Sequence, residues 1–342
     1  MRAAVYRRFG GPDNVRVEEL PRPPVGRDDV LIQVHTSTVS AADHRARSRE
    51  VPRGLWLLAA VGIGAFRPKR PVLGMDVAGV VEAVGSEVTR FAPGDEVIAM
   101  LGGAFGGHAE YARVRQDGPI ALKPRSMTFE DAVTLVFGGL TARGFLGQAH
   151  VAPGATVLVN GASGAVGSAA VQLAKPAGAH VTGVCSGGNR DLVTELGADR
   201  VIDHTVDDFT AEAATYDVIV DCVGNASFER VRHLLKPGGA LLLVITDLPG
   251  LLRAPLRSRR TDHVVTAGPG QGTAEDLAAL VDLAEAGSFR AVRDRTFDLG
   301  DIAEAHRYVD TGRKRGNVVV RIAQAQPGRA APLTRTSGRA SS

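Results

Sequence analysis

The stretch from Ala155 to Cys185 constrains the fold more than any other. It reads ATVLVNGASGAVGSAAVQLAKPAGAHVTGVC: an apolar strand, a glycine-containing turn, an amphipathic helix and a second apolar strand. That order and spacing predict a βαβ unit in a parallel sheet covered on both faces. Against the pattern G-x-G-x-x-G, Ala162 stands at the first glycine, while Gly164 and Gly167 are in register. The turn therefore predicts a dinucleotide site with the pyrophosphate at the helix N-terminus; the alternative is a purely structural turn.

The end of the second strand indicates which dinucleotide would bind. NAD sites usually place an Asp or Glu there to accept hydrogen bonds from the ribose 2′-hydroxyl. Here the strand ends in the residues CSGG, without a carboxylate. Ser186, Asn189 and Arg190 instead suit a 2′-phosphate, so we expect NADP(H). The alternative is that Arg190 only begins a solvated helix.

Strand and helix patterns divide the chain, whose fold class we predict to be α/β, into two domains. Residues 1–124 hold short β-type runs between Gly- and Pro-containing turns, which predict the first part of an antiparallel, barrel-like domain. Residues 125–265 alternate apolar strands with helices, which predicts a doubly wound parallel sheet. Residues 266–323 end in a further β run and are expected to complete the first domain. Residues 324–342, rich in Pro, Ser, Arg and Ala, are expected to be disordered.

Composition argues against several function classes. The 40 basic and 37 acidic residues leave a net charge of +3, and the basic residues are scattered, so we expect no nucleic-acid partner. The sequence has no run of about 18 apolar residues that would span a membrane, and its first residues lack the apolar core of a signal peptide. Cys185 and Cys222 lie far apart in the sequence and favour a reducing compartment. We therefore expect a cytoplasmic protein without a membrane partner.

Several separated motifs together resemble a known family. They are GMDVAGVVEAVG, PGDEV, AEYARV, GLTA, NGASGAVGSAAVQLAK, LGADRVIDH, DVIVDCVG and LKPGGALLLV, spread between Met1 and Ile322. In this combination the chain resembles the medium-chain dehydrogenase/reductase superfamily, and more narrowly its zinc-independent quinone oxidoreductase and enoyl reductase branch. The resemblance implies a GroES-like, barrel-type catalytic domain with an inserted Rossmann domain.

The positions that hold catalytic zinc in other members of this superfamily are changed here. The segment TVSAADHR has no cysteine, and Met75 stands where a histidine would precede the acidic residue, Asp76. Catalytic zinc needs three protein ligands and an open position. The nine histidines are scattered and do not restore such a set. We therefore expect no metal, and we expect Asp76 to be a buried anchor bonded to backbone or to a basic side chain.

The resemblance implies an activity that fits the loss of zinc. It implies that NADPH reduces an apolar quinone or α,β-unsaturated carbonyl substrate; alternatives are an alcohol dehydrogenase of the same superfamily and a non-catalytic NADPH-binding protein. Ser40 and Asp43 are the candidate catalytic residues, with Ser40 at a position where many members have Asn. The competing interpretation pairs Asp43 with Arg47 in a structural ion pair. His44 is a candidate proton donor by residue type alone.

The resemblance also implies a set of cofactor-binding residues. It assigns Thr141 to the nicotinamide side of the dinucleotide. The remaining assignments are Ala162, Ser163, Gly164, Ala165 and Val166 to the pyrophosphate, Ser186, Asn189, Arg190 and His204 to the 2′-phosphate end, and Val223, Ile245 and Asn317 to the wall of the cofactor site. Many NADP-binding relatives have Lys at Asn189 and Tyr at His204.

Two further features concern the surface of the molecule. The segment from Pro52 to Arg70 is unusually apolar for a loop, and it predicts either a lid over an apolar substrate or a helix buried in the first domain. The run GGALLLVIT is expected to form the edge strand of the parallel sheet. An exposed edge of this kind can pair with a second copy, so we expect a homodimer.

Overall fold

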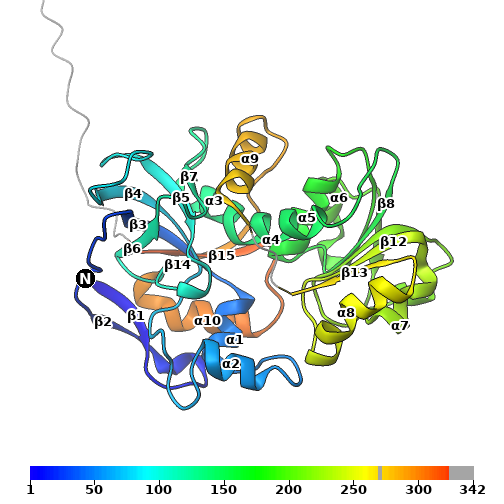
Figure 1. Cartoon of the computed structure of the whole chain (residues 1–342), viewed down its shortest axis with the longest axis horizontal. Coiled ribbons are helices and arrows are strands. Elements are labelled where there is room, and N and C mark those ends of the chain that lie inside the picture. The colour runs from blue at the N-terminus through cyan, green and yellow to red at the C-terminus, as the bar shows by residue number, and fades with distance from the viewer. Residues whose placement is uncertain (269–271, 323–342) are drawn as a thin grey trace, which may run out of the picture.

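The computed structural model describes residues 1–268 and 272–322, which fold into two lobes (Figure 1). One lobe holds mostly antiparallel strands from both ends of the chain, and the other holds a parallel sheet from its middle. Helix α4 (Val136–Leu146) lies between them and contacts α5 (Ala165–Ala174) of the second lobe as well as strands of the first.

The first domain is built on a sheet with the strand order β14-β15-β3-β4-β5-β7, to which β6 adds by pairing with β3. Its strands are β3 (Asp29–Val39), β4 (Asp76–Val84), β5 (Glu96–Met100), β6 (Tyr111–Arg115), β7 (Ile120–Leu122), β14 (Arg293–Asp298) and β15 (Asn317–Arg321). A separate pair, β1 (Arg2–Tyr6) and β2 (Val15–Glu19), forms a two-stranded sheet. Helices α1 (Ala41–Ser48), α2 (Trp56–Gly62), α3 (Phe129–Ala132) and α10 (Ile302–Asp310) complete this part.

The second domain is a six-stranded parallel sheet with the order β10-β9-β8-β11-β12-β13. Its strands are β8 (Thr156–Asn160), β9 (His180–Cys185), β10 (Arg200–Asp203), β11 (Tyr216–Asp221), β12 (Leu235–Leu243) and β13 (Val264–Ala267). Helices α5, α6 (Arg190–Glu195), α7 (Phe228–Val231) and α8 (Leu248–Arg260) accompany it, whereas α9 (Ala274–Glu285) contacts β7 of the first domain and α4. The predicted α/β fold, with a parallel-sheet domain of this kind, is confirmed.

The central strand β8 shows why this sheet is covered on both faces. Val157 and Val159 belong to a core that includes residues of α4 and α5, whereas Leu158 belongs to a second core on the opposite face. All three side chains are fully buried. Because strand side chains alternate between faces, a continuous apolar run requires a helical layer on each side.

Two expectations about this domain are corrected. The boundary expected at residue 265 falls inside β13, because that strand continues in register with β12 as far as Ala267 opposite Leu243. For the same reason β12, which carries most of GGALLLVIT, is not the edge strand: it pairs with β11 on one side and β13 on the other. The short run VVTA after α8 takes the edge position instead.

Two other expectations concern segments at the surface. Helix α2 within Pro52–Arg70 has no buried residue, and Trp56 is 59% exposed, so the prediction of a buried helix is wrong. In residues 1–268 and 272–322, every helix is too short or too polar to cross a membrane. The tail at 324–342, predicted to be disordered, lies outside the described residues.

Candidate active site

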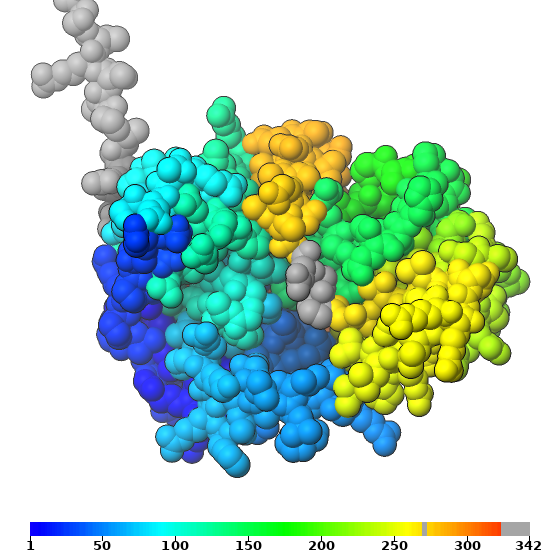
Figure 2. Space-filling model, viewed as in Figure 1, coloured from blue at the N-terminus to red at the C-terminus, as the bar shows by residue number. Residues whose placement is uncertain are grey.

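A cavity of about 650 Å³ lies where the two domains meet. Figure 2 shows the face of the molecule on which the first domain, in blue and cyan, approaches the second, in green and yellow. The first domain lines the cavity with α1, the loop before β4, the loop after β5 and the segment before β15. The second domain lines it with the glycine turn and the ends of β11 and β12. Apolar side chains dominate its wall, among them Met75, Met100, Phe137, Phe145 and Val244.

The glycine turn has the geometry of a phosphate cradle. Gly161 has φ +82°, a left-handed conformation that favours glycine. A Cβ built on Gly167 would lie 2.1 Å from the carbonyl oxygen of Gly161, so only glycine allows α5 to approach β8 this closely. Gly164 is the N-cap of α5 and supplies no capping side chain. The first residues of α5 line the cavity, and no side chain caps their N–H groups, which fits the pyrophosphate of a dinucleotide.

The predicted 2′-phosphate residues come together at the ends of β9 and β10. The Asn189 side-chain amide donates hydrogen bonds to the hydroxyls of Ser163 and Ser186, each at 3.1 Å. Arg190 begins α6, and its guanidinium donates to the Val201 carbonyl at 3.2 Å. The backbone N–H of His204 donates to the carbonyl oxygen of Cys185 at 3.1 Å, which places His204 beside the same strand ends.

A carboxylate that the sequence analysis did not consider also lies here. A Cβ built on Gly187 would be 2.3 Å from Asp203 Oδ2, so Asp203 stands against the turn after β9. Its carboxylate accepts hydrogen bonds from the Thr205 N–H and hydroxyl, which hold the pKa of Asp203 below its ordinary value. The residues at this end therefore include both a cation and a carboxylate.

Of the other predicted cofactor residues, five line the cavity, whereas Ala162, Val223 and Asn317 do not. Thr141, Gly164, Ala165, Val166 and Ile245 line the cavity. Ala162 is fully buried behind the turn, whereas Val223 lies against it, with Cγ2 2.9 Å from a Cβ built on Gly161. Asn317 is also buried, and its amide donates to the carbonyl oxygens of Thr134 and Val292. Asn317 thus links chain segments instead of facing the cavity.

Ser40 and Asp43 form the N-terminal cap of α1. The Ser40 hydroxyl accepts from the backbone N–H of Asp43 at 3.2 Å, and the Asp43 carboxylate accepts from the Ser40 N–H at 2.8 Å. The other Asp43 oxygen accepts from the N–H of Gly74 at 2.8 Å. Both side chains are buried, so the chain itself satisfies these groups. The structure therefore favours an anchoring role for this pair.

The expected ion pair between Asp43 and Arg47 is wrong. The Arg47 guanidinium instead donates to both carboxylate oxygens of Asp310 at 2.6 Å and to the Gly10 carbonyl. His44 Nδ1 also meets Asp310, at 2.7 Å. Residues 43 and 47 lie one turn apart on a helix, but the capping role turns Asp43 back toward Ser40, and α10 brings Asp310 to the arginine.

Asp76 is a fully buried anchor, as expected. Its carboxylate accepts hydrogen bonds from the backbone N–H of Thr38 and from the Thr38 hydroxyl, all at 2.9 Å. Burial raises the pKa of Asp76 to about 7, although the hydrogen bonds from Thr38 oppose this shift.

The residues present do not fit a catalytic zinc ion. Beside Asp76 the chain offers the thioether of Met75, and Ser40 uses its hydroxyl in the helix cap. Within the described part of the chain, no three His, Cys, Asp or Glu side chains gather in a group that could hold a metal. Since zinc requires three such ligands, we derive no chemistry from a metal here.

Two cations in the cavity wall were not predicted from the sequence. Lys314 precedes β15 and donates from Nζ to the Gly316 carbonyl at 2.6 Å. The Gly316 N–H donates to the Ser163 carbonyl at 2.7 Å, which fastens this segment to the glycine turn. Burial lowers the pKa of Lys314 to about 8, while Asp294 and Asp76 oppose the shift. Arg45 of α1 is the second cation. Lys314 lies in the sequence RKRGN, where a lysine between two arginines looks like an ordinary surface residue, so the sequence did not predict its place in the cavity.

The first domain is a mostly antiparallel sheet, the second is a parallel sheet, and a dinucleotide cradle lies where they meet. This arrangement is a two-domain dehydrogenase architecture. Family models match this chain at residues 26–125, for the alcohol dehydrogenase GroES-like domain, and at residues 196–320, for zinc-binding dehydrogenase.

Individual relatives extend the match over nearly the whole chain. The chain is 31% identical to quinone-oxidoreductase QR1, chloroplastic, of Triphysaria versicolor, with 94% of this chain and 98% of the relative covered. It is 31% identical to an NADPH-dependent alkenal/one oxidoreductase, chloroplastic, of Arabidopsis thaliana, with 94% and 79% covered. The solved structure of a quinone oxidoreductase from Coxiella burnetii superposes with a TM-score of 0.84 at 28% identity, covering 94% of this chain and 99% of that one. The chain belongs to the medium-chain dehydrogenase/reductase superfamily, in its quinone oxidoreductase-like branch, and is an oxidoreductase of that family.

Proposed function

We propose that this protein reduces quinones or α,β-unsaturated carbonyl compounds with NADPH as the hydride donor and without a metal ion. The observation that carries the proposal is the make-up of the cavity at the domain junction. This cavity combines a phosphate cradle with an apolar wall that includes Lys314. Among the described residues around it, His, Cys, Asp and Glu side chains do not form a zinc site. The names of two relatives, a quinone oxidoreductase and an alkenal/one oxidoreductase, support the substrate class.

The chain offers partners for each end of the dinucleotide. The N-terminus of α5, from Gly164 to Val166, would hold the pyrophosphate, and Thr141 and Ile245 would lie along the nicotinamide. Ser186, Asn189 and Arg190 would meet the 2′-phosphate, with His204 nearby. When bound, NADPH supplies a hydride to an acceptor beside it. Asp203 at the same strand end is the reason to compare NADPH with NADH directly.

The remaining chemistry belongs to the cavity wall. Apolar side chains such as Met75 and Phe137 exclude water and favour an apolar acceptor over a polar one. Reduction of a quinone or an enone places negative charge on the substrate oxygen, and the Lys314 ammonium stabilises such a charge in a low-dielectric site. Because burial brings the pKa of Lys314 to about 8, it can also release a proton to that oxygen near neutral pH.

The test is NADPH oxidation with a panel of acceptors and a parallel metal determination. A benzoquinone, an unsaturated aldehyde and a cyclic enone are compared with a primary alcohol offered together with NADP⁺, and each reduction is repeated with NADH. The proposal predicts turnover of quinones or enones by protein that contains no stoichiometric metal. Turnover confined to alcohols, or dependent on added zinc, would contradict it. Tight NADPH binding without turnover of any acceptor would favour the non-catalytic alternative.

A further inference from the structure

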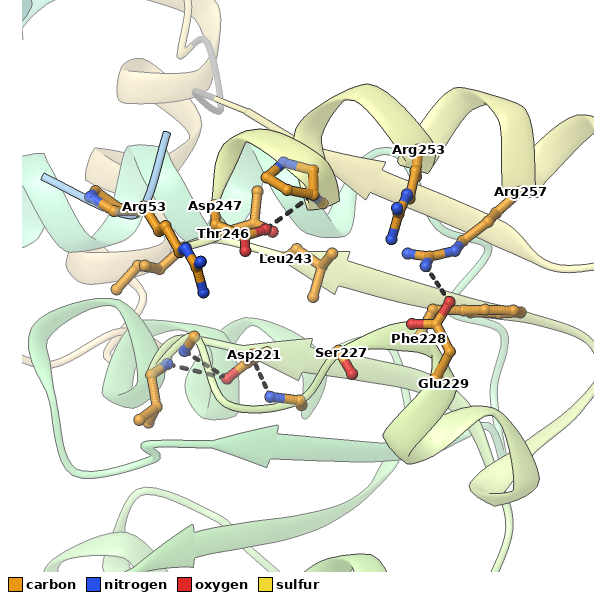
Figure 3. A pocket seen from close by; sticks show the side chains of 17 residues that line it. Arg53, Asp221, Ser227, Phe228, Glu229, Leu243, Thr246, Asp247, Arg253 and Arg257 are labelled. Carbon is orange, nitrogen blue, oxygen red and sulfur yellow. Dashed lines mark hydrogen bonds and ion pairs between the residues drawn. The ribbon is translucent and has the colours of Figure 1, made fainter. Parts of the chain in front are cut away.

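A second pocket, of about 360 Å³, lies at another part of the domain junction (Figure 3). The second domain contributes the loops after β11 and β12 and the first turns of α8; the first domain contributes Pro52 and Arg53. The two sides are joined by a hydrogen bond from the Leu248 N–H to the Arg53 carbonyl at 3.0 Å. Ile245 lines this pocket as well as the cavity of the candidate active site.

Three arginines surround this pocket. Arg253 and Arg257 stand four residues apart on α8, so they lie on one face of the helix, and Arg53 approaches from the opposite domain (Figure 3). Arg257 forms an ion pair with Glu229 and lies over the ring of Phe228 at 5.4 Å. Neither Arg53 nor Arg253 forms an ion pair with any residue of the described chain.

The carboxylates around the pocket are already engaged by the chain. Asp221 accepts hydrogen bonds from the N–H groups of Val223, Gly224 and Ala226 and from the Asn160 amide. Asp247 caps α8 by accepting from the Gly250 N–H at 2.8 Å. Glu229 is bound to Arg257. The carboxylates thus serve backbone caps and one ion pair, while the guanidinium groups of Arg53 and Arg253 keep their donors for a ligand.

We propose that this pocket binds a small organic anion, with a phosphate or carboxylate group held by Arg53 and Arg253, at a site separate from NADPH. A guanidinium presents paired donors that match either group. The remaining wall is partly apolar, with Val223, Leu243 and Pro249, so a ligand with a compact apolar body fills the space beyond the charge. The proposal does not depend on the proposed hydride transfer, because it concerns binding alone.

The test is calorimetric titration of the whole protein with phenyl phosphate, benzoate, inorganic phosphate and the neutral benzyl alcohol. We expect saturable binding of phenyl phosphate or benzoate, tighter than that of inorganic phosphate, and none of benzyl alcohol. Tighter binding of phenyl phosphate identifies a phosphate ligand, and tighter binding of benzoate a carboxylate ligand. The anion should still bind at saturating NADPH, because Arg53 and Arg253 line this pocket and not the cavity of the candidate active site.

Substitutions locate the bound anion. Arg53→Gln and Arg253→Gln should each weaken binding roughly ten- to a hundredfold, the cost of a lost charge-assisted contact. Arg259→Gln is the matched control, because Arg259 is exposed on the same helix and does not line the pocket. Arg253→Lys keeps the charge and should weaken binding less than Arg253→Gln. Three results would overturn the proposal: no saturable anion binding, binding unaffected by both Gln variants, or displacement by NADPH, which would place the anion in the dinucleotide site.

Discussion

Replacement of Asp76 by Asn should remove a pH dependence from the stability of this protein. In the folded chain the pKa of Asp76 is raised from 3.8 to about 7, chiefly by burial. The folded state therefore binds this proton over a pH range in which the unfolded state has lost it, and stability falls as pH rises from about 4 through 7. At 1.36 kcal/mol per pKa unit, the shift of roughly three units corresponds to about 4 kcal/mol over the whole range.

The measurement is urea unfolding followed by circular dichroism, for the wild-type protein and Asp76→Asn at about pH 5 and about pH 8. Over that interval, the free energy of unfolding of the wild type should fall by about 3 kcal/mol relative to the variant, because Asn does not titrate. Asp282→Asn, which alters an exposed carboxylate on α9, is the control and should keep the wild-type pH dependence. An equal pH dependence in the wild type and Asp76→Asn would refute the claim that Asp76 is held protonated by burial.

Three further predictions concern the site and the assembly. Lys314→Met should lower kcat/KM for a quinone or enone about 10- to 100-fold. The wild-type kcat/KM should decline above about pH 8 as the Lys314 ammonium deprotonates. A decline of the same shape in the variant would contradict a role of Lys314 in the reaction. Arg190→Ala should raise KM for NADPH at least severalfold with little effect on NADH, as measured by steady-state kinetics; equal effects on both would remove Arg190 from the 2′-phosphate. Light scattering should give about twice the chain mass of 35.7 kDa. Val264→Lys should shift the protein toward the monomer, because it places a charge on the edge strand β13. A monomeric wild type would contradict the predicted homodimer.

Local sequence patterns predicted most of the fold because the interactions behind them are local. The glycine turn requires a close approach between α5 and β8. Glycines at positions 161 and 167 indicate this approach in the sequence, because a side chain at position 167 would clash with the Gly161 carbonyl. The alternation of apolar strands and helices likewise reports a sheet that is covered on both faces. The anchor role of Asp76 followed from the missing zinc ligands beside it, because a carboxylate without a metal must be hydrogen-bonded by the chain when it is buried.

Long-range partners account for what the sequence did not predict. Arg47 meets Asp310 across 263 positions of the chain, so its proximity to Asp43 in sequence was misleading. Lys314 lies in the cavity wall on a segment that the Gly316 N–H bonds to the glycine turn, a contact between residues 153 positions apart in the sequence. Arg53 and Arg253 come from different domains, and no spacing in the sequence brings them together. The edge strand was misplaced because the four-residue β13 is too short to give a clear periodic pattern.

We propose that this oxidoreductase transfers hydride from NADPH to a quinone or enone without a metal. The most direct measurement is the rate of NADPH oxidation by protein that has been treated with a chelator and shown by elemental analysis to lack zinc, with a quinone or an enone as acceptor. We expect a rate equal to that of the untreated protein and unchanged by added zinc. Loss of activity on chelation, restored by zinc, would contradict it.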